Sequence, residues 1–277
     1  MNHSKREGRS PGIGAAGPVL RRYAVPRWPA AWWVAFLACK PVLVVLRRPD
    51  WRGLDEIPRA GGAVLAVNHI SELDPLLIAE AVLSTGRTPA FLAKSSLFED
   101  GLVGRWFRAA GHVRVDRQRG GGGFADALDA VRAGALVVVY PEGSISTAPG
   151  SGLLPLKTGA VRLAVEAGVP LLPVAQLGAQ EILPAYSRRL RIRPLRRPTV
   201  SIQVGRPMDL EGARTCRAGS PPVHACTLRL AEVLSEMIDD LRPANTGPGR
   251  GQLETVYAFR RLGTWCTRRS RPSVPRE

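Results

Sequence analysis

The sequence predicts an α/β fold, a layered domain with a largely parallel mixed sheet flanked by helices. Short apolar runs alternate with helical windows along residues 50–242, a pattern typical of strands joined by crossover helices. The 277 residues, of which 45% are hydrophobic, are sufficient for one sizeable core. Polar clusters directly follow two of the apolar runs, so we expect two strand ends to build one site.

An apolar segment precedes the predicted domain. Residues 30–46 contain one charged residue, Lys40, and arginines flank the segment on both sides. As a helix it reaches roughly 25 Å, short of the roughly 30 Å hydrocarbon core of a bilayer. We therefore expect residues 28–49 to be a membrane-associated helical segment that lies in the interface, with tryptophans at headgroup depth. The alternative is a core helix. A cleaved signal peptide is disfavoured because no small-residue cleavage site follows.

The remaining elements follow in chain order. The strands are expected at residues 63–67, 90–93, 113–115, 136–140, 171–174 and 199–204. The helices are expected at residues 75–83, 104–109, 124–133, 158–167 and 224–241. The four glycines Gly120–Gly123 lack the Lys-Ser/Thr that follows in a phosphate-binding loop, so we interpret them as a flexible turn before a helix.

The two ends of the chain and its charge limit the classes of partner. Residues 1–27 and the tail 243–277 are basic and rich in Gly and Pro, so we expect both to be largely disordered, with one short basic helix around residues 253–265. A net charge of +16 favours anionic partners. No nucleic-acid-binding motif is evident, and much of the charge surrounds the apolar segment, where it suits an anionic membrane surface.

The four cysteines form no CxxC pair and show no zinc-ligand spacing. We therefore expect unpaired thiols in a reducing compartment and no bound metal.

A histidine and an aspartate, His69 and Asp74, follow the strand expected at 63–67. Proline at position 75 favours the start of a helix, so the two side chains can meet if His69 lies in the loop before that helix. A carboxylate on one ring nitrogen fixes the imidazole tautomer and leaves the other nitrogen to take a proton from a hydroxyl. Asp before Pro is also an ordinary helix cap, and Ser71 with Asp74 has capping-box spacing, so the pair alone leaves both interpretations open.

Four motifs in order, from about residue 53 to 210, resemble the glycerolipid acyltransferase family, the PlsC-like lysophosphatidic acid acyltransferases. The motifs are Asn68-His69-x4-Asp74-Pro75, Gly111-His112-Val113-Arg114-Val115-Asp116-Arg117, Tyr140-Pro141-Glu142-Gly143-Ser144 and Val169-Pro170-Leu171-Leu172-Pro173-Val174. Lys94 and the stretch Lys157-Thr158-Gly159-Ala160 also stand where the family usually has such residues. The order and spacing of the motifs make the resemblance specific.

The resemblance implies an O-acyltransferase in which His69 is the general base and Asp74 orients it. The acceptor hydroxyl then attacks an acyl thioester directly. The substrate-binding residues that it implies are Lys94, Arg117, Glu142, Gly143 and Ser144. Arg117 can grip a phosphate, the Gly143 amide can approach a substrate oxygen, and Glu142 anchors loop amides or a substrate hydroxyl.

The implied reaction transfers a fatty acyl group from acyl-CoA or acyl carrier protein to the hydroxyl of a lysophospholipid. The first candidate acceptor is 1-acylglycerol-3-phosphate, which gives phosphatidic acid, and no cofactor is expected beyond the thioester co-substrate. The expected location is the cytoplasmic face of the cell membrane, as a peripheral or monotopic protein.

One residue departs from the family pattern. The third motif commonly continues with an arginine that helps to bind the acceptor phosphate, whereas this chain has Ile145. Another polar-lipid acceptor is therefore one alternative. A non-catalytic membrane- or lipid-binding relative is a second, against which the intact His69 and Asp74 argue.

Overall fold

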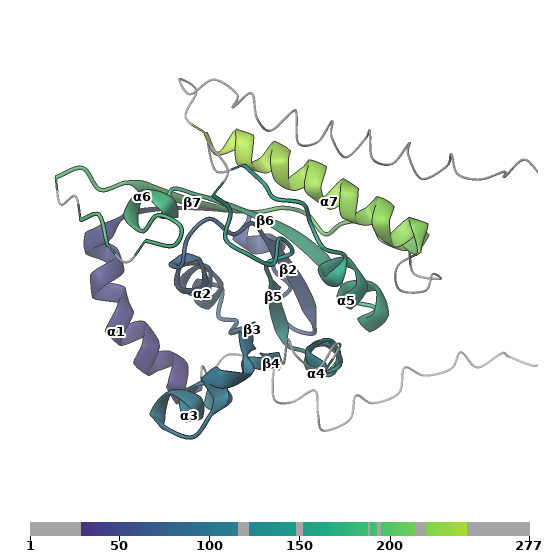
Figure 1. The fold of residues 1–277 in the computed structure, drawn as a ribbon, viewed down its shortest axis with the longest axis horizontal. Coiled ribbons are helices and arrows are strands. Elements are labelled where there is room, and N and C mark those ends of the chain that lie inside the picture. The colour runs from purple at the N-terminus through teal and green to yellow at the C-terminus, as the bar shows by residue number, and fades with distance from the viewer. Residues whose placement is uncertain are drawn as a thin grey trace, which may run out of the picture.

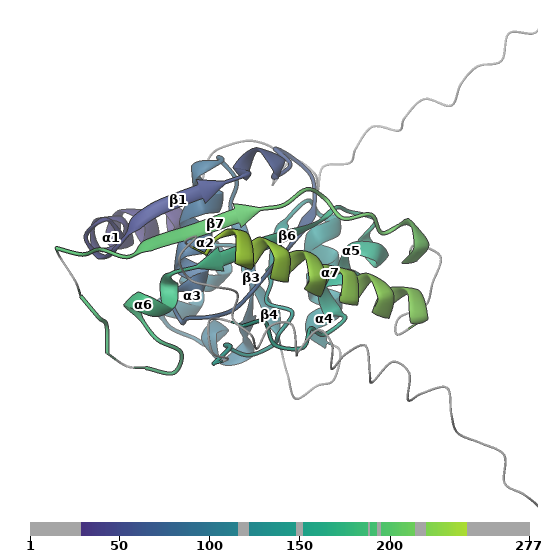
Figure 2. The same cartoon turned by 90° about the horizontal axis from the view of Figure 1, so that it is seen from above.

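The computed structural model describes residues 29–115, 122–147, 152–187, 189–192, 195–213 and 220–242. Seven strands form one sheet between two layers of helices (Figures 1 and 2), so the predicted α/β fold is confirmed. The predictions for the N-terminus 1–27 and the tail 243–277 lie outside the described residues, as do Gly120 and Gly121 of the glycine run.

The sheet has the strand order β1-β7-β6-β2-β5-β3-β4. Its pairs are parallel except β6 with β7, so β1 and β7 run opposite to the other five. The bounds are β1 Arg48–Arg52, β2 Ala63–Val67, β3 Pro89–Lys94, β4 Val113–Val115, β5 Leu136–Val139, β6 Leu171–Leu177 and β7 Thr199–Val204. The six strands that the sequence predicts are all present, within a few residues at their ends.

Helices α1, α2 and α3 cover one face of the sheet, and α4, α5 and α7 cover the other (Figure 1). The α-helices are α1 Ala30–Leu46, α2 Asp74–Ser84, α3 Leu102–Ala109, α4 Gly122–Arg132, α5 Gly159–Ala167, α6 Ala179–Ile182 and α7 Pro221–Asp240. Short 3-10 turns are η2 Leu54–Glu56, η3 Ser95–Phe98 and η5 Glu211–Ala213.

The central strands are apolar throughout because both of their faces are covered. In β2, Leu65 and Val67 pack in the cluster on the α2 side, whereas Val64 and Ala66 pack in the cluster beneath α4, α5 and α7. Successive side chains of a strand point to opposite faces, so a strand buried on both faces is a continuous hydrophobic run. This explains why the sequence shows unbroken apolar runs here.

One side of α1 packs firmly against the domain. The Trp32 side chain is only 3% exposed, and its indole Nε1 donates to the Ala110 carbonyl at 3.0 Å. Trp106 on α3 donates from its own Nε1 to the Ala31 carbonyl at 2.8 Å. These two reciprocal indole bonds join α1 and α3.

An ion cluster joins α1 to α2. The Glu80 carboxylate on α2 accepts from Lys40 at 2.5 Å and from Arg47 just after α1. The Arg47 side chain is 2% exposed and also lies over the Trp51 ring, 4.6 Å from its centroid. The carboxylate therefore neutralises a cation that is buried between the helix and the sheet.

The other side of α1 exposes apolar side chains. Its exposed large hydrophobic residues are Trp33, Val34, Leu37, Val42, Val44 and Val45. Among the described residues, no helix is long and apolar enough to cross a membrane. The segment expected to be helical is thus a helix with one packed side and one exposed apolar side, which combines features of both interpretations of the sequence.

Strand β1 was missed by the sequence prediction and crosses the expected boundary between residues 49 and 50. Its sequence, Arg48-Pro49-Asp50-Trp51-Arg52, is charged and contains a proline, so it lacks a strand pattern. It lies at the edge of the sheet, beside β7 alone, where charged residues and proline are tolerated. The short helix α6 was also missed.

Candidate active site

Two neighbouring strand ends build the candidate site. Strands β2 and β5 are parallel and in register, with Ala66 opposite Val139. The chain therefore leaves both strands at the same edge of the sheet, which brings His69 and Glu142 together. This is the arrangement that the two polar clusters predicted.

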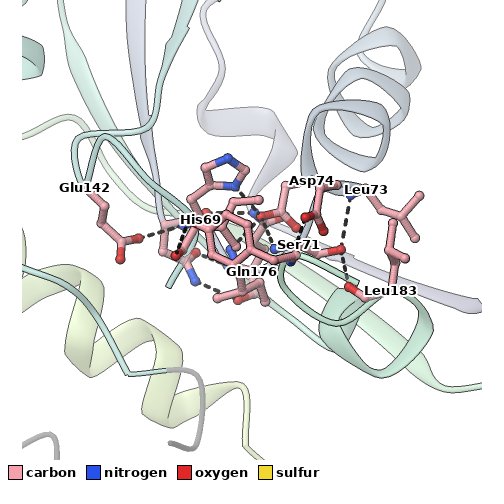
Figure 3. A network of polar contacts seen from close by, with 12 residues as sticks. His69, Ser71, Leu73, Asp74, Glu142, Gln176 and Leu183 are labelled. Carbon is pink, nitrogen blue, oxygen red and sulfur yellow. Dashed lines mark hydrogen bonds and ion pairs between the residues drawn. The ribbon is translucent and has the colours of Figure 1, made fainter. Parts of the chain in front are cut away.

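The His69 and Asp74 side chains meet directly, with 2.8 Å between Nδ1 and Oδ2 (Figure 3). His69 lies in the loop after β2, and Asp74 is the first residue of α2, as expected. The same carboxylate oxygen accepts the amide N–H of Ile70 at 2.6 Å and of Ser71 at 2.9 Å. Because an ionised carboxylate only accepts hydrogen bonds, the contact favours the tautomer with its proton on Nδ1, which leaves Nε2 free to accept a proton.

Asp74 is the first residue of α2 rather than its N-cap, which is Leu73 and has no side-chain cap bond. The bond from the Ser71 amide to the Asp74 carboxylate does have the spacing expected for a capping box, within the turn that precedes the helix. The Ser71 hydroxyl does not complete the box, because it donates to the Leu183 carbonyl at 2.7 Å and accepts from the Leu73 amide at 3.1 Å. One carboxylate therefore starts the helix and orients the imidazole.

Burial dominates the electrostatics of this pair. Asp74 is fully buried, and burial raises its pKa above the ordinary value, while the donors His69, Ser71 and Ile70 oppose that rise. Three N–H donors on one oxygen are the arrangement that favours the ionised carboxylate.

The ring of Tyr140 stacks on the His69 imidazole, with 4.1 Å between the ring centroids and 21° between the planes. Burial, and then the charge of Asp74, raise the pKa of Tyr140 well above its ordinary value, so it remains a neutral phenol. Its hydroxyl and Asp74 Oδ1 are both buried and have no hydrogen-bond partner among the described residues. The imidazole is thus held at its edge by a carboxylate and on one face by an aromatic ring.

Glu142 ties together three loops rather than facing solvent. One carboxylate oxygen accepts the His69 amide at 2.7 Å, and the other accepts the Leu154 amide at 2.8 Å. The side chain is buried, and burial raises its pKa to about 7 although both amide bonds oppose the rise. Of the two uses expected for Glu142, the structure shows the anchoring of loop amides.

The turn at residues 140–143 corrects the expectation for the Gly143 amide. That N–H donates to the Tyr140 carbonyl at 3.0 Å, so it closes a β-turn with Pro141 in the position that proline favours. It is therefore committed to the turn and is not available to a substrate oxygen in this conformation.

Asn68 and Gln176 form a buried clasp beside His69 that the sequence analysis did not assign. Asn68 Nδ2 donates to the Gln176 carbonyl at 3.0 Å, and Gln176 Nε2 donates to the Asn68 carbonyl at 2.7 Å. The Gln176 amide also donates to Asn68 Oδ1 at 2.7 Å. The signal in the sequence is one amide side chain directly after an apolar run and another within one, because buried polar groups require partners.

The remaining predicted substrate-binding residues are Lys94, Ser144 and Arg117. Lys94 ends β3 at the same edge of the sheet with an exposed side chain, and Ser144 is exposed on the loop after β5. The structure brings neither into the hydrogen-bond network of His69. Arg117 lies outside the described residues.

A cation beside the third motif comes from Lys157. Gly143 has a φ of +75°, and a Cβ placed there would lie only 2.5 Å from Lys157 Nζ. The Lys157 amide also donates to the Pro141 carbonyl at 2.8 Å. The positive φ favours glycine here, and the missing side chain lets the ammonium lie against this turn. Lys157 stands in a family-like stretch of the sequence, but its position in the chain did not indicate a place in the site.

Comparisons with known proteins agree with this geometry. Residues 48–176 match the family model described as Acyltransferase. The chloroplastic 1-acyl-sn-glycerol-3-phosphate acyltransferase BAT2 of Brassica napus is 30% identical over 144 residues, which are 50% of this chain and 40% of the relative. The 1-acyl-sn-glycerol-3-phosphate acyltransferase of Escherichia coli is 27% identical over 185 residues, 65% of this chain and 69% of the relative.

The fold also resembles a solved structure. The crystal structure of PlsC, the 1-acyl-sn-glycerophosphate acyltransferase of Thermotoga maritima, aligns with a TM-score of 0.57 and 22% identity, covering 78% of this chain and 80% of that one.

Residues 48–176 are thus similar in sequence to the Acyltransferase family model, and the fold is similar to that of PlsC. The chain spans half or less of the length of the Brassica relative and of the mouse 1-acyl-sn-glycerol-3-phosphate acyltransferase alpha.

Proposed function

We propose that the chain transfers a fatty acyl group from an acyl thioester, acyl-CoA or acyl carrier protein, to the hydroxyl of a lysophospholipid. The observation that carries this proposal is the contact between His69 Nδ1 and Asp74 Oδ2. It leaves Nε2 as the nitrogen that can take a proton, next to the turn of the third motif.

In this reaction His69 Nε2 takes the proton from the acceptor hydroxyl as the oxygen attacks the thioester carbonyl carbon. The Asp74 carboxylate stabilises the imidazolium that forms, and Tyr140 keeps the ring plane fixed. When the C–S bond breaks, the imidazolium returns the proton to the leaving thiolate. The base is thereby regenerated without a covalent acyl-enzyme.

The preferred acceptor is 1-acylglycerol-3-phosphate, with phosphatidic acid as the product. Its phosphate requires cations, and Lys157 supports this choice because its ammonium lies against the turn at Gly143. Arg117 and Lys94 are further candidates for the same role. Ile145 supports the second candidate, an acceptor with another polar headgroup, because it cannot bind phosphate.

We further propose that the exposed apolar side of α1 lies in the membrane interface on the cytoplasmic face. Leu102 and Val103 of α3 extend this surface, and Arg105 and Arg108 on the same helix are exposed. Apolar side chains bordered by cations fit the surface of an anionic bilayer. A lysophospholipid acceptor is itself a component of such a surface.

The test measures thiol release from acyl-CoA with a panel of lysolipids, for the wild type and for His69→Ala. We expect the variant to lose about 100- to 10,000-fold in kcat, the usual contribution of a general base, while circular dichroism shows an unchanged fold. A folded and equally active His69→Ala variant would refute the catalytic assignment. Transfer to phosphate-free acceptors only would refute phosphatidic acid as the product.

A further inference from the structure

A short strap between α6 and β7, residues 183–186, connects the first and third motif loops. The Ser71 hydroxyl donates to the Leu183 carbonyl at 2.7 Å, and the Tyr186 amide donates to Glu72 Oε1 at 2.6 Å. The Tyr186 hydroxyl donates in turn to the Ile145 carbonyl at 3.4 Å. The strap thus contacts both loops that flank His69.

These contacts lie within a few residues of the base. Ser71 and Glu72 are two and three positions after His69 in the chain. Ile145 precedes Ser146, whose amide donates to the His69 carbonyl at 2.7 Å. Tyr186 therefore borders the candidate site through its amide on one side and its phenol on the other.

The backbone at Tyr186 is strained. Its φ of 58° is the single positive φ of a non-glycine residue among the described part of the chain. The left-handed region is unfavourable for a residue with a Cβ, and least so for Asn and Asp. The charge-assisted bond from the Tyr186 amide to Glu72 holds this conformation.

Burial of the aromatic ring does not offset the backbone strain, because Tyr186 is 65% exposed. Among the described residues its hydroxyl contacts only the Ile145 carbonyl, at a distance near the long limit of a hydrogen bond. A strained residue that presents a loosely held donor beside an active site is better explained by ligand contact than by packing.

We propose that Tyr186 is a substrate-binding residue, whose phenol hydroxyl donates a hydrogen bond to a phosphate oxygen of the acceptor headgroup. The proposal rests on the proposed acyl transfer and names a donor at the place where Ile145 removes the arginine of the family pattern. On binding, the Tyr186 hydroxyl exchanges its weak bond to the Ile145 carbonyl for a charge-assisted bond to phosphate. The affinity for the headgroup therefore depends on the hydroxyl of Tyr186 and not on its aromatic ring.

The experiment compares Tyr186→Phe with wild type, using acyl-CoA with 1-acylglycerol-3-phosphate and, separately, with monoacylglycerol. We expect the KM for the phosphate-bearing acceptor to rise about tenfold, as for one hydrogen bond to a charged group. The KM for monoacylglycerol should change less than twofold. An equal KM for 1-acylglycerol-3-phosphate in wild type and Tyr186→Phe overturns the proposal, as does an equal rise for both acceptors.

Two further variants separate binding from folding. Tyr186→Gly suits the positive φ, so it should fold at least as well as wild type and show a similar rise in KM. Ser84→Ala removes a hydroxyl that donates to the Ala81 carbonyl at the end of α2 opposite Asp74, so the KM for either acceptor should not change. A change in Ser84→Ala equal to that in Tyr186→Phe overturns the proposal. If wild-type protein transfers acyl groups to no acceptor, the proposed function itself fails, which is a separate result.

Discussion

The carboxyl edge of β2 and β5 and the outer side of α1 are opposites in chemical character. At the strand edge, Asp74 and Glu142 are buried, and most of their oxygens accept a hydrogen bond from a neighbouring loop. On α1, side chains such as Leu37, 67% exposed, are apolar and lie in the open. The first region encloses polar groups, and the second presents hydrophobic ones.

This difference indicates that the two regions contribute to function in different ways. A buried polar network fixes the position of individual atoms, because an unpaired group there is costly. An exposed apolar surface acts through its area and tolerates change at any single position. Single-atom changes should therefore matter most at the strand edge, whereas charge introduced over several side chains should matter most on α1.

The largest effect is expected for Asp74→Asn. The substitution keeps the size of the side chain but removes the charge that orients and stabilises the imidazolium. We expect kcat for acyl transfer to fall about 100- to 10,000-fold, measured by thiol release. Asp129→Asn, on the exposed side of α4, is the matched control and should retain wild-type kcat. A folded Asp74→Asn variant with a kcat within tenfold of wild type would show that the buried carboxylate does not control catalysis.

The next effect concerns the attachment of α1 to the domain. Glu80→Gln leaves the buried Arg47 without its counter-charge, which should lower the free energy of unfolding by about 3 kcal/mol, measured by urea denaturation. Lys40→Met removes the partner whose side chain is 42% exposed, so we expect a loss below about 1 kcal/mol. Equal losses in the two variants would show that burial of Arg47 does not govern the attachment.

The outer side of α1 is tested by the double variant Val34→Asp and Leu37→Asp. Burial of one leucine side chain is worth about 1.5–3 kcal/mol, so binding to anionic lipid vesicles should weaken at least about tenfold in a sedimentation assay. The free energy of unfolding should change by less than about 0.5 kcal/mol. Leu228→Asp, an exposed leucine on α7, is the control and should bind vesicles as wild type does. If the double variant bound vesicles as the wild type does, the exposed side of α1 would not be the membrane-binding surface.

The smallest effect concerns the pH dependence of stability at Glu142. Its pKa is about 7 in the folded protein and 4.5 ordinarily, so between these values the folded state holds a proton that the unfolded chain has released. The free energy of unfolding should therefore fall as the pH rises through this window, by about 1–3 kcal/mol.

Glu142→Gln should lose that slope in urea denaturation at pH 5, 6 and 7. It should also be less stable at pH 5, because an amide cannot accept from both the His69 and Leu154 N–H groups. Glu236→Gln, an exposed carboxylate on α7, should retain the wild-type slope. A slope that persists in Glu142→Gln would assign the titration to another group.

The strands were predictable wherever burial on both faces imposed an apolar run, as at 63–67 and 136–139. Strand β1 was not predictable, because an edge position relaxes the pattern and its pairing with β7 involves residues about 150 positions away. The helical segment at 30–46 was predicted, but not the packing of its Trp32 against α3, because periodicity does not reveal which partner lies opposite.

The same limit holds for the candidate site. His69 and Asp74 were predictable because both lie in one loop and one helix start. The stacking of Tyr140 on His69, the clasp of Asn68 with Gln176 and the contact of Lys157 with Gly143 join residues that are distant in the chain. Such contacts depend on strand order, which the sequence alone does not specify.

The paired indole bonds of α1 and α3 have a consequence for orientation. A helix fixed at one point can pivot, whereas Trp32 and Trp106 hold these two helices at two points in opposite directions. Neither helix can turn about one bond without breaking the other. In the membrane contact proposed for α1, the two helices would then meet the lipid surface as one unit with a fixed angle between them.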